Sequence, residues 1–141
     1  MRASRILALD VGMKRIGLAV SDALGITAQG LETIDRADTV SFDKVVRENE
    51  IAEIVVGLPL NMDGTQGERA QDAVRFADGL KEKYPIPVTM WDERLSTRHA
   101  EKEMIRGDLS RRKRKGLSDM VAAQLILQSY LDMKKLRTTE R

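Results

Sequence analysis

The opening stretch of the chain has the apolar pattern of a β-hairpin. Residues 6–9 are an unbroken apolar run, as expected of a central strand buried on both faces. Residues 13–15 are the predicted turn, and over residues 16–20 apolar side chains alternate with small ones, as in a returning strand. Asp10 places a carboxylate where the first apolar run should continue. A charge beside a buried strand is costly unless a cation or hydrogen-bond donors meet it, so Asp10 is the first candidate functional residue.

Further along the chain, the hydrophobic and polar patterns predict more strands and helices. They are a third, more polar strand over residues 26–34, a short helix capped by Ser41, a strand over residues 53–58, a helix opened by the capping-box spacing of Thr65 and Glu68, a strand over residues 88–91, a polar helix from Ser96 or Thr97 to about residue 106, and a final helix from residue 117 to about residue 135. The final helix is apolar almost all round between Met120 and Leu127, which indicates that it is buried.

This order of elements predicts an α/β protein with a mixed central sheet and helices on both faces. The first three strands are expected to be antiparallel neighbours, with the third at an edge. The later strands are expected to run parallel to the first, because crossover helices precede them. The length of 141 residues predicts a single domain, residues 1–141, large enough to bury a core. Parallel strands present their carboxyl ends at one edge of the sheet, where ligands bind.

Three acidic positions form a candidate site at that edge. Asp10 and the neighbours Asp92 and Glu93 end two of the predicted parallel strands. Alternation puts Asp92 and Glu93 on opposite faces, so only one can point at Asp10, and Arg94 can pair with the other. Asp119 stands at the start of the predicted final helix, which packs against the sheet. Each acid also has a purely structural interpretation, as a turn cap, as part of a charged loop, or as a residue favoured by the helix dipole.

The types of the candidate residues indicate the chemistry. Carboxylates that converge in one crevice repel each other unless cations neutralise them. The chain has no cysteine and one histidine, His99, which we interpret as a surface helix residue. Oxygen ligands alone favour Mg²⁺ or Mn²⁺ over Zn²⁺. Two such ions about 4 Å apart can activate a water and stabilise the leaving oxygen when a phosphodiester is displaced.

Positive charge is concentrated in two places, although the formal net charge is only +2. Five consecutive basic residues precede the final predicted helix, and we expect them to form a mobile loop because adjacent like charges repel. Two more lie in the predicted hairpin turn. Phosphate contacts from these side chains would position a nucleic-acid backbone without reading its bases. The predicted nucleic-acid-binding residues are Lys14, Arg15, Arg111, Arg112, Lys113, Arg114 and Lys115.

The composition excludes several classes of protein. No apolar run approaches the ~18 residues of a membrane span, and the first residues lack the pattern of a signal peptide. Without cysteine there is no disulfide framework and no cysteine nucleophile, which favours a cytoplasmic protein. Aromatic residues make up 4% of the chain, too few to predict a platform for stacking unpaired bases. Recognition of backbone and shape is therefore expected.

Asn61, Asp63 and Thr65 are a second candidate site. They follow the predicted strand over residues 53–58, where a loop meets a helix N-terminus, and such ends bind phosphate readily. The same residue types also satisfy turn and cap geometry with no ligand. Both interpretations stay open.

Four segments carry a resemblance to a known family. They are residues 9–12 with 15–21, residues 56–64, residues 92–97, and Asp119 ahead of an apolar helix. In these motifs the chain resembles the YqgF/RuvX family of RuvC-related, Holliday-junction-resolvase-like proteins, also described as nucleases for the 5′ end of pre-16S ribosomal RNA. The resemblance covers about residues 5–131. It implies a ribonuclease H-like fold, a bacterial cytoplasmic setting and metal-dependent phosphodiester cleavage, with Asp10, Glu93 and Asp119 as the catalytic and metal-binding residues.

These observations together predict a nuclease dependent on Mg²⁺ or Mn²⁺ that acts on structured nucleic acid. The favoured role is processing of the 5′ end of pre-16S ribosomal RNA by a monomer or weak homodimer. One alternative is a Holliday-junction resolvase, which must cut two strands symmetrically and so needs a dimer. A second is a nucleic-acid-binding assembly factor without turnover. A third is an ATPase of the actin or sugar-kinase type, whose first phosphate motif the Asp10 hairpin also resembles, but those proteins enclose ATP between two domains.

Overall fold

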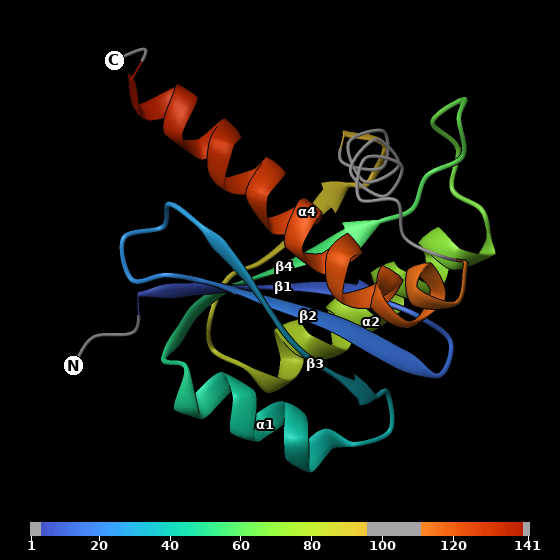
Figure 1. The fold of residues 1–141 in the computed structure, drawn as a ribbon, viewed down its shortest axis with the longest axis horizontal. Helices are drawn as coiled ribbons and strands as arrows, with labels where there is room; N and C mark the ends of the chain where they lie inside the picture. Colours follow the sequence, from blue (N-terminus) through green and yellow to red (C-terminus); the bar gives the residue numbers. More distant parts are fainter. Residues whose placement is uncertain (1–3, 96–110, 140–141) are drawn as a thin grey trace.

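The central sheet has five strands in the order β3-β2-β1-β4-β5 (Figure 1). The computed structural model describes residues 4–95 and 111–139, of which residues 111–118 and 137–139 by their backbone alone. Its elements are, in chain order, β1 (Arg5–Val11), β2 (Arg15–Ser21), β3 (Ala28–Asp35), α1 (Thr39–Glu48), β4 (Ile51–Leu58), α2 (Glu68–Lys83), β5 (Val88–Asp92) and α4 (Arg111–Thr139). Strands β1 to β3 are antiparallel neighbours, and β4 and β5 run parallel to β1. The predicted mixed sheet and the edge position of β3 are therefore confirmed.

Side chains alternate across the sheet and build a core on each of its faces. Leu7, Leu9 and Val11 of β1 belong to the core that α1 and α2 cover. Ile6 and Ala8 of the same strand belong to the core that α4 covers. Figure 1 shows this layering, with α4 on one side of the sheet and α1 and α2 on the other. The apolar run of β1 thus serves two cores, as its continuous hydrophobicity predicted.

The sheet face under α4 is built from small residues. Ala8 and Ala19 are fully buried there, and Gly17 of β2 lies directly opposite Asp10. A Cβ atom at Gly17 would lie 2.1 Å from the carbonyl oxygen of Asp119, so the missing side chain lets the α4 backbone approach the sheet. This close packing brings Asp119 to the neighbourhood of the β1 carboxyl end.

The final helix begins earlier than predicted. Helix α4 starts at Arg111, so residues 111–115 form its first turns and the predicted loop is wrong. Arginine and lysine are among the stronger helix formers, which favours a helix over a loop in this stretch. Asp119 therefore lies about two turns inside the helix, and its interpretation as a residue of the first turn is also wrong.

Two helix starts use other caps than predicted. Asp38, and not Ser41, caps α1, and its carboxylate accepts hydrogen bonds from the Ser41 backbone N–H at 3.0 Å and hydroxyl at 2.6 Å. Gly67 is the N-cap of α2 and makes no side-chain cap bond. The Thr65 hydroxyl donates to Asp63 instead, at 2.6 Å. The predicted capping box is therefore wrong, because Thr65 finds a nearer acceptor within its own loop.

Residues 96–110 lie outside the described part of the chain. The predicted polar helix that begins at Ser96 or Thr97 belongs to this stretch, and so does His99. Among the described helices, none is both long and apolar enough to span a membrane.

Candidate active site

Asp10 lies near the carboxyl end of β1, on the face of the sheet that α4 covers. Its neighbours Leu9 and Val11 point to the opposite core, so strand alternation turns the Asp10 side chain toward α4. On both flanking strands the nearest positions on this face are glycines. Gly17 pairs with Asp10 across β1 and β2, and Gly57 of β4 follows the residue that pairs with Leu9. The carboxyl group therefore occupies a slot that is free of neighbouring strand side chains.

Glu93 enters this slot from the end of β5. Its backbone N–H donates to the carbonyl oxygen of Leu58 at 3.0 Å, which ties the residue to β4. Its side chain lies over Gly57, where a Cβ atom would be 2.7 Å from Glu93 Oε1. The carboxyl groups of Glu93 and Asp10 are joined by a hydrogen bond. Two acids that are far apart in the sequence thus meet at the carboxyl edge of the sheet, as the strand order predicted.

The environment of this carboxyl pair keeps a proton on it at neutral pH. Burial, and next the charge of Asp10, raise the pKa of Glu93 to about 8. Burial also raises the pKa of Asp10, although the hydrogen bond from Glu93 opposes that shift. A proton on the pair is also required by the hydrogen bond, because two ionised carboxylates offer only acceptors. Burying two carboxyl groups together is tolerated because one of them is neutral.

Asp119 approaches the carboxyl pair but does not join it. Its negative charge contributes to the raised pKa of Asp10, so the two groups are electrostatic neighbours. Its own carboxylate lies 3.9 Å from a guanidinium nitrogen of Arg15 and is about one-third exposed, at 34%. Among the residues that the structure describes, no three His, Cys, Asp or Glu side chains are grouped closely enough to hold a metal ion. The structure therefore brings together two of the three predicted acids and places the third beside them.

The donor chemistry of the pair nevertheless suits a hard divalent cation. Asp10 and Glu93 offer only oxygen atoms, from two separate strands, in a slot closed by backbone. The shared proton lies between the two carboxyl groups, where positive charge offsets their mutual repulsion. Asp10 and Glu93 fit as ligands for Mg²⁺ or Mn²⁺. Asp119 fits as a further ligand only if it turns away from Arg15.

Arg69 is a residue of this site that the sequence patterns did not reveal. It lies in the first turn of α2, and its positive charge lowers the pKa of both Asp10 and Glu93. Arg69 is a cationic residue among the groups that shift the pKa values of both acids. The available signal was a basic residue just inside a helix that follows a strand's carboxyl end.

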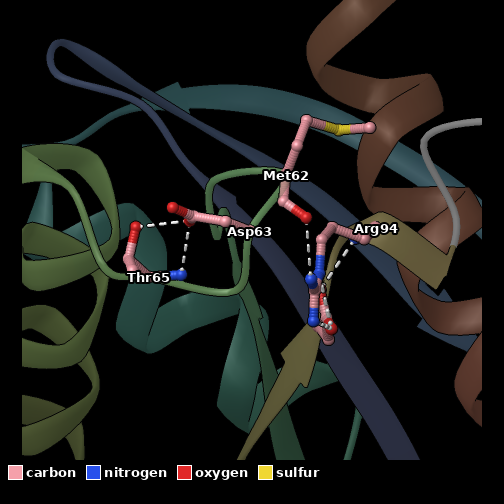
Figure 2. A network of polar contacts seen from close by, with 5 residues as sticks. Met62, Asp63, Thr65 and Arg94 are labelled. Atoms are coloured by element: carbon pink, nitrogen blue, oxygen red, sulfur yellow. Dashed lines mark hydrogen bonds and ion pairs between the residues drawn. The ribbon is translucent and has the colours of Figure 1, made fainter.

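Asp92 points away from the carboxyl pair and belongs to a different network. Arg94 donates to the Asp92 carboxylate from Nε at 3.0 Å and from Nη2 at 2.8 Å. These hydrogen bonds hold the pKa of Asp92 below its ordinary value. Arg94 also donates to the carbonyl oxygen of Met62 at 3.4 Å, and Figure 2 shows it reaching from the end of β5 to the loop that follows β4. As alternation predicted, one of the two neighbouring acids faces Asp10 and the other pairs with Arg94.

The loop of Asn61, Asp63 and Thr65 closes on itself. Asp63 accepts hydrogen bonds from the backbone N–H of Thr65 at 3.0 Å and from its hydroxyl at 2.6 Å (Figure 2). Asn61 donates to the Thr65 hydroxyl at 3.0 Å, and Gly64 takes a positive φ of 88°. The polar groups of the loop satisfy one another, which favours the turn interpretation over a phosphate site.

The basic residues of the hairpin turn lie beside Asp119. Lys14 and Arg15 are exposed and line a hollow of about 390 Å³ together with Asp119 and Asp35. The basic residues 111–115 precede Asp119 on the same helix, and their side chains lie outside the described part of the structure. Their contact with nucleic acid stays a prediction.

Comparison with known proteins gives one consistent result. A family model described as "RuvX: Holliday junction resolvase" matches residues 4–133. A "Putative pre-16S rRNA nuclease" of Oceanobacillus iheyensis is 50% identical over 136 residues, which cover 92% of this chain and 99% of that protein. A protein of the same name from Geobacillus kaustophilus is 51% identical over 138 residues, covering 93% and 99%. The structure of "T. thermophilus RuvC in complex with Holliday junction substrate" superimposes with a TM-score of 0.54 at 19% identity, covering 92% of this chain and 95% of that one. The last similarity confirms the ribonuclease H-like fold, and the match over nearly the whole sequence shows that the chain belongs to the RuvX family.

Proposed function

We propose that this chain is a metal-dependent nuclease that hydrolyses phosphodiester bonds in structured nucleic acid, and that its substrate is the 5′ end of pre-16S ribosomal RNA in the bacterial cytoplasm. The observation that carries the proposal is the buried, hydrogen-bonded pair of Asp10 and Glu93 at the carboxyl edge of a RuvC-like sheet. Relatives about half identical over nearly their full length are named for this substrate.

Asp10 and Glu93 would hold Mg²⁺ or Mn²⁺, with Asp119 as a third ligand. Nucleases of the RuvC-like type generally depend on divalent cations. A bound ion supplies an activated water and stabilises the charge that develops on the phosphate oxygens. Glu93 would give up its proton to hold such an ion, because positive charge would offset the burial and repulsion that raise its pKa.

Basic side chains around the edge of the sheet would hold the substrate. Arg69 already stabilises negative charge on the two carboxyl groups and would do the same for a phosphate that approaches them. Lys14 and Arg15 on the hairpin, with residues 111–115 of α4, would contact flanking phosphates on the other side. Their role is to position the backbone over the acids.

A cleavage assay tests this function directly. The purified protein is incubated with end-labelled pre-16S precursor RNA and Mn²⁺, and the products are mapped. We expect cuts at discrete positions near the 5′ end of the mature sequence that stop when the ion is chelated. Tight binding of the precursor without any cleavage would instead identify a non-catalytic assembly factor.

A junction resolvase is the second candidate, because the matching family model carries that description. A resolvase needs two active sites related by symmetry, and therefore a dimer. The same preparation is tested on a four-way DNA junction, and its mass is measured in solution. Paired symmetrical nicks by a dimer, with the precursor RNA left intact, would replace the proposed RNA substrate with a junction.

A further inference from the structure

Two adjacent hollows lie on the sheet face opposite α4, along helix α2. The first has a volume of about 580 Å³ and opens where β1 ends, between Met13 and Arg69. The second, of about 300 Å³, lies further along α2 and is lined by side chains of α1 and α2. Arg36 and Arg75 line both hollows. Because the two hollows share these two residues, we call them together the α2 groove.

The two arginines shared by the hollows have different roles. Arg36 donates to both carboxylate oxygens of Asp72, at 2.6 and 2.8 Å, and to the carbonyl oxygen of Gly12 at 3.1 Å. Its guanidinium also lies 5.2 Å from the ring centre of Phe76, so it is a fixed part of the wall. Arg75 forms a long ion pair of 3.9 Å with Asp72 and no other ion pair within the described part of the chain, and 68% of its side chain is exposed. Its guanidinium is thus available to an incoming anion.

The first hollow lies at the end of β1, on the opposite face of the sheet from the carboxyl pair. Arg69 lines this hollow, and its charge also acts on both Asp10 and Glu93. Val11, the residue after Asp10, lines the same hollow from the end of β1. A strand bound over the carboxyl pair would therefore reach the α2 groove by passing the end of β1 and Arg69.

The second hollow gathers most of the aromatic side chains of the chain. The sequence has two phenylalanines, two tyrosines and one tryptophan, and both phenylalanines and one tyrosine line this hollow as Phe42, Phe76 and Tyr84. The low aromatic content argued against base stacking, but the fold concentrates these residues in one place. Phe42 is buried in the core, so the partly buried Phe76 and Tyr84 supply the aromatic surface of the hollow. The volume of about 300 Å³ matches the lower end of small-ligand sites, which run from about 300 to 1,000 Å³.

Gly79 lines the second hollow from an exposed position on α2. It lies inside α2, where glycine disfavours the helix relative to alanine. A Cβ atom at this position would meet no atom within 4 Å, so packing does not require a glycine here. Gly79 is part of the lining of the hollow, so a larger residue at this position would project into the open space beside the aromatic rings.

We propose that the α2 groove binds a single-stranded segment of nucleic acid that continues past the end of β1 from the carboxyl pair, with a backbone phosphate on Arg75 and an unpaired base in the aromatic hollow beside Gly79. This rests on the proposed nuclease function and specifies the form of its substrate. Guanidinium groups match phosphate, and aromatic side chains stack on any base. A duplex cannot place a base in the hollow without unpairing it, so the groove selects an unpaired flank.

The phosphate contact is tested by comparing Arg75→Ala with Lys81→Ala. Both residues lie on α2 and form i,i+3 ion pairs of 3.9 Å, with 68% and 53% of the side chain exposed, but Lys81 does not line the groove. Binding of fluorescent single-stranded RNA is measured by anisotropy across salt concentrations. Arg75→Ala should reduce the slope of log K against log salt by about 0.7. If the variant and the wild type bind equally at 1 M salt, the variant should then bind about fivefold more weakly than the wild type at 0.1 M salt. Lys81→Ala should leave the slope unchanged, and equal slopes for the two variants would overturn the phosphate contact.

The base contact is tested by Gly79→Leu, which fills the hollow, with Gly79→Ala as the smaller change. We expect both variants to melt at or above the wild-type temperature, since either residue favours the helix. Gly79→Leu should weaken single-stranded RNA binding about tenfold while duplex binding stays unchanged, and Gly79→Ala should fall between. Unchanged single-strand affinity in a folded Gly79→Leu protein, or an equal loss for duplex, would overturn the base contact. If Gly79→Leu does not fold, Gly79→Ala and Arg75→Ala decide the question.

These outcomes separate the groove from the proposed function. A wild-type protein that binds and cuts RNA, with variants that bind as it does, refutes the groove and leaves the nuclease intact. The groove would then be open to a protein partner. A wild-type protein that binds no nucleic acid refutes both proposals.

Discussion

Asp92 and Glu93 are adjacent in the sequence, yet they belong to two regions with opposite electrostatics. Glu93 turns toward Asp10, and burial beside a second carboxyl group raises its pKa to about 8. Asp92 turns toward Arg94, whose hydrogen bonds lower the pKa of Asp92. In the first region, two buried carboxyl groups repel each other beneath α4. In the second, an ion pair between Asp92 and Arg94 holds the loop that follows β4. Strand alternation and the partner that each acid meets decide which carboxylate is available for chemistry.

Removing one acid from each region should give the largest difference, in cleavage. Asp10→Asn should lower metal-dependent cleavage by at least about a thousandfold, because it removes a ligand on which the several kcal/mol supplied by the ion depend. Asp92→Asn should lose less than about tenfold, because Asp92 acts only through Arg94 and the loop. Single-turnover rates on precursor RNA make the comparison, and thermal melting checks the fold. Full activity in a folded Asp10→Asn protein would remove Asp10 from the mechanism.

Glycines in the two regions should differ next, in stability. Gly17→Ala places a Cβ against the backbone of Asp119 and should destabilise the protein by about 2–3 kcal/mol, since neither backbone can yield easily. Gly64→Ala in the loop meets no close backbone but must take a φ near +88°, which costs about 1 kcal/mol. Urea denaturation measures both free energies of unfolding. A Gly17→Ala variant as stable as wild type would contradict the close approach of α4.

The contribution of Glu93 to the free energy of unfolding should depend on pH. The pKa of Glu93 is higher in the folded protein than its ordinary 4.5, so its contribution to stability is lost as pH rises from about 4.5 to about 8. Glu93→Gln, which keeps the hydrogen-bond donor, should therefore be about 1–2 kcal/mol more stable than wild type at pH 8 and no more stable at pH 4. An identical gain at both pH values would show that Glu93 is ordinarily ionised in the fold.

Asp92→Asn should show the opposite trend with a smaller size. The lowered pKa of Asp92 stabilises the fold above about pH 4, and this contribution is lost as pH falls through the folded-state pKa. Because the ion pair with Arg94 is partly exposed and screened, the loss at pH 7 should stay below about 1 kcal/mol. Melting curves of wild type and variant at pH 7 and pH 3 measure it. A larger loss at pH 3 than at pH 7 would reverse the assignment.

The strand pattern allowed much of this arrangement to be predicted. Apolar runs and alternation identify the strands, and the rule for parallel strand ends brings Asp10 and Glu93 to one edge. Alternation also predicted that only one of Asp92 and Glu93 would face Asp10, with Arg94 available to the other. These are local or topological properties, so a single sequence is enough to read them. The choice of Glu93 as the acid that faces Asp10 came from the resemblance to the RuvX family.

Other features depend on contacts that no local pattern encodes. Whether Arg69 acts on the two acids depends on which way α2 is turned about its axis. The size of the hollow beside Gly79 depends on where α1 packs. Thr65 had two possible partners, and only the folded loop decides between them. The basic residues 111–115 were assigned to a loop because repulsion was weighed without the helix propensity of arginine and lysine.

Asp10 and Glu93 share a proton in the free protein, and a bound divalent cation would replace it. Calorimetric titration of the protein with Mn²⁺ at pH 7, in buffers of different ionisation enthalpy, counts the protons released on binding. Wild type and Asp92→Asn should each release about one proton per bound ion, and Glu93→Gln should release almost none. Binding of Mn²⁺ without proton release in wild type, or release that depends on Asp92 and not on Glu93, would contradict the claim.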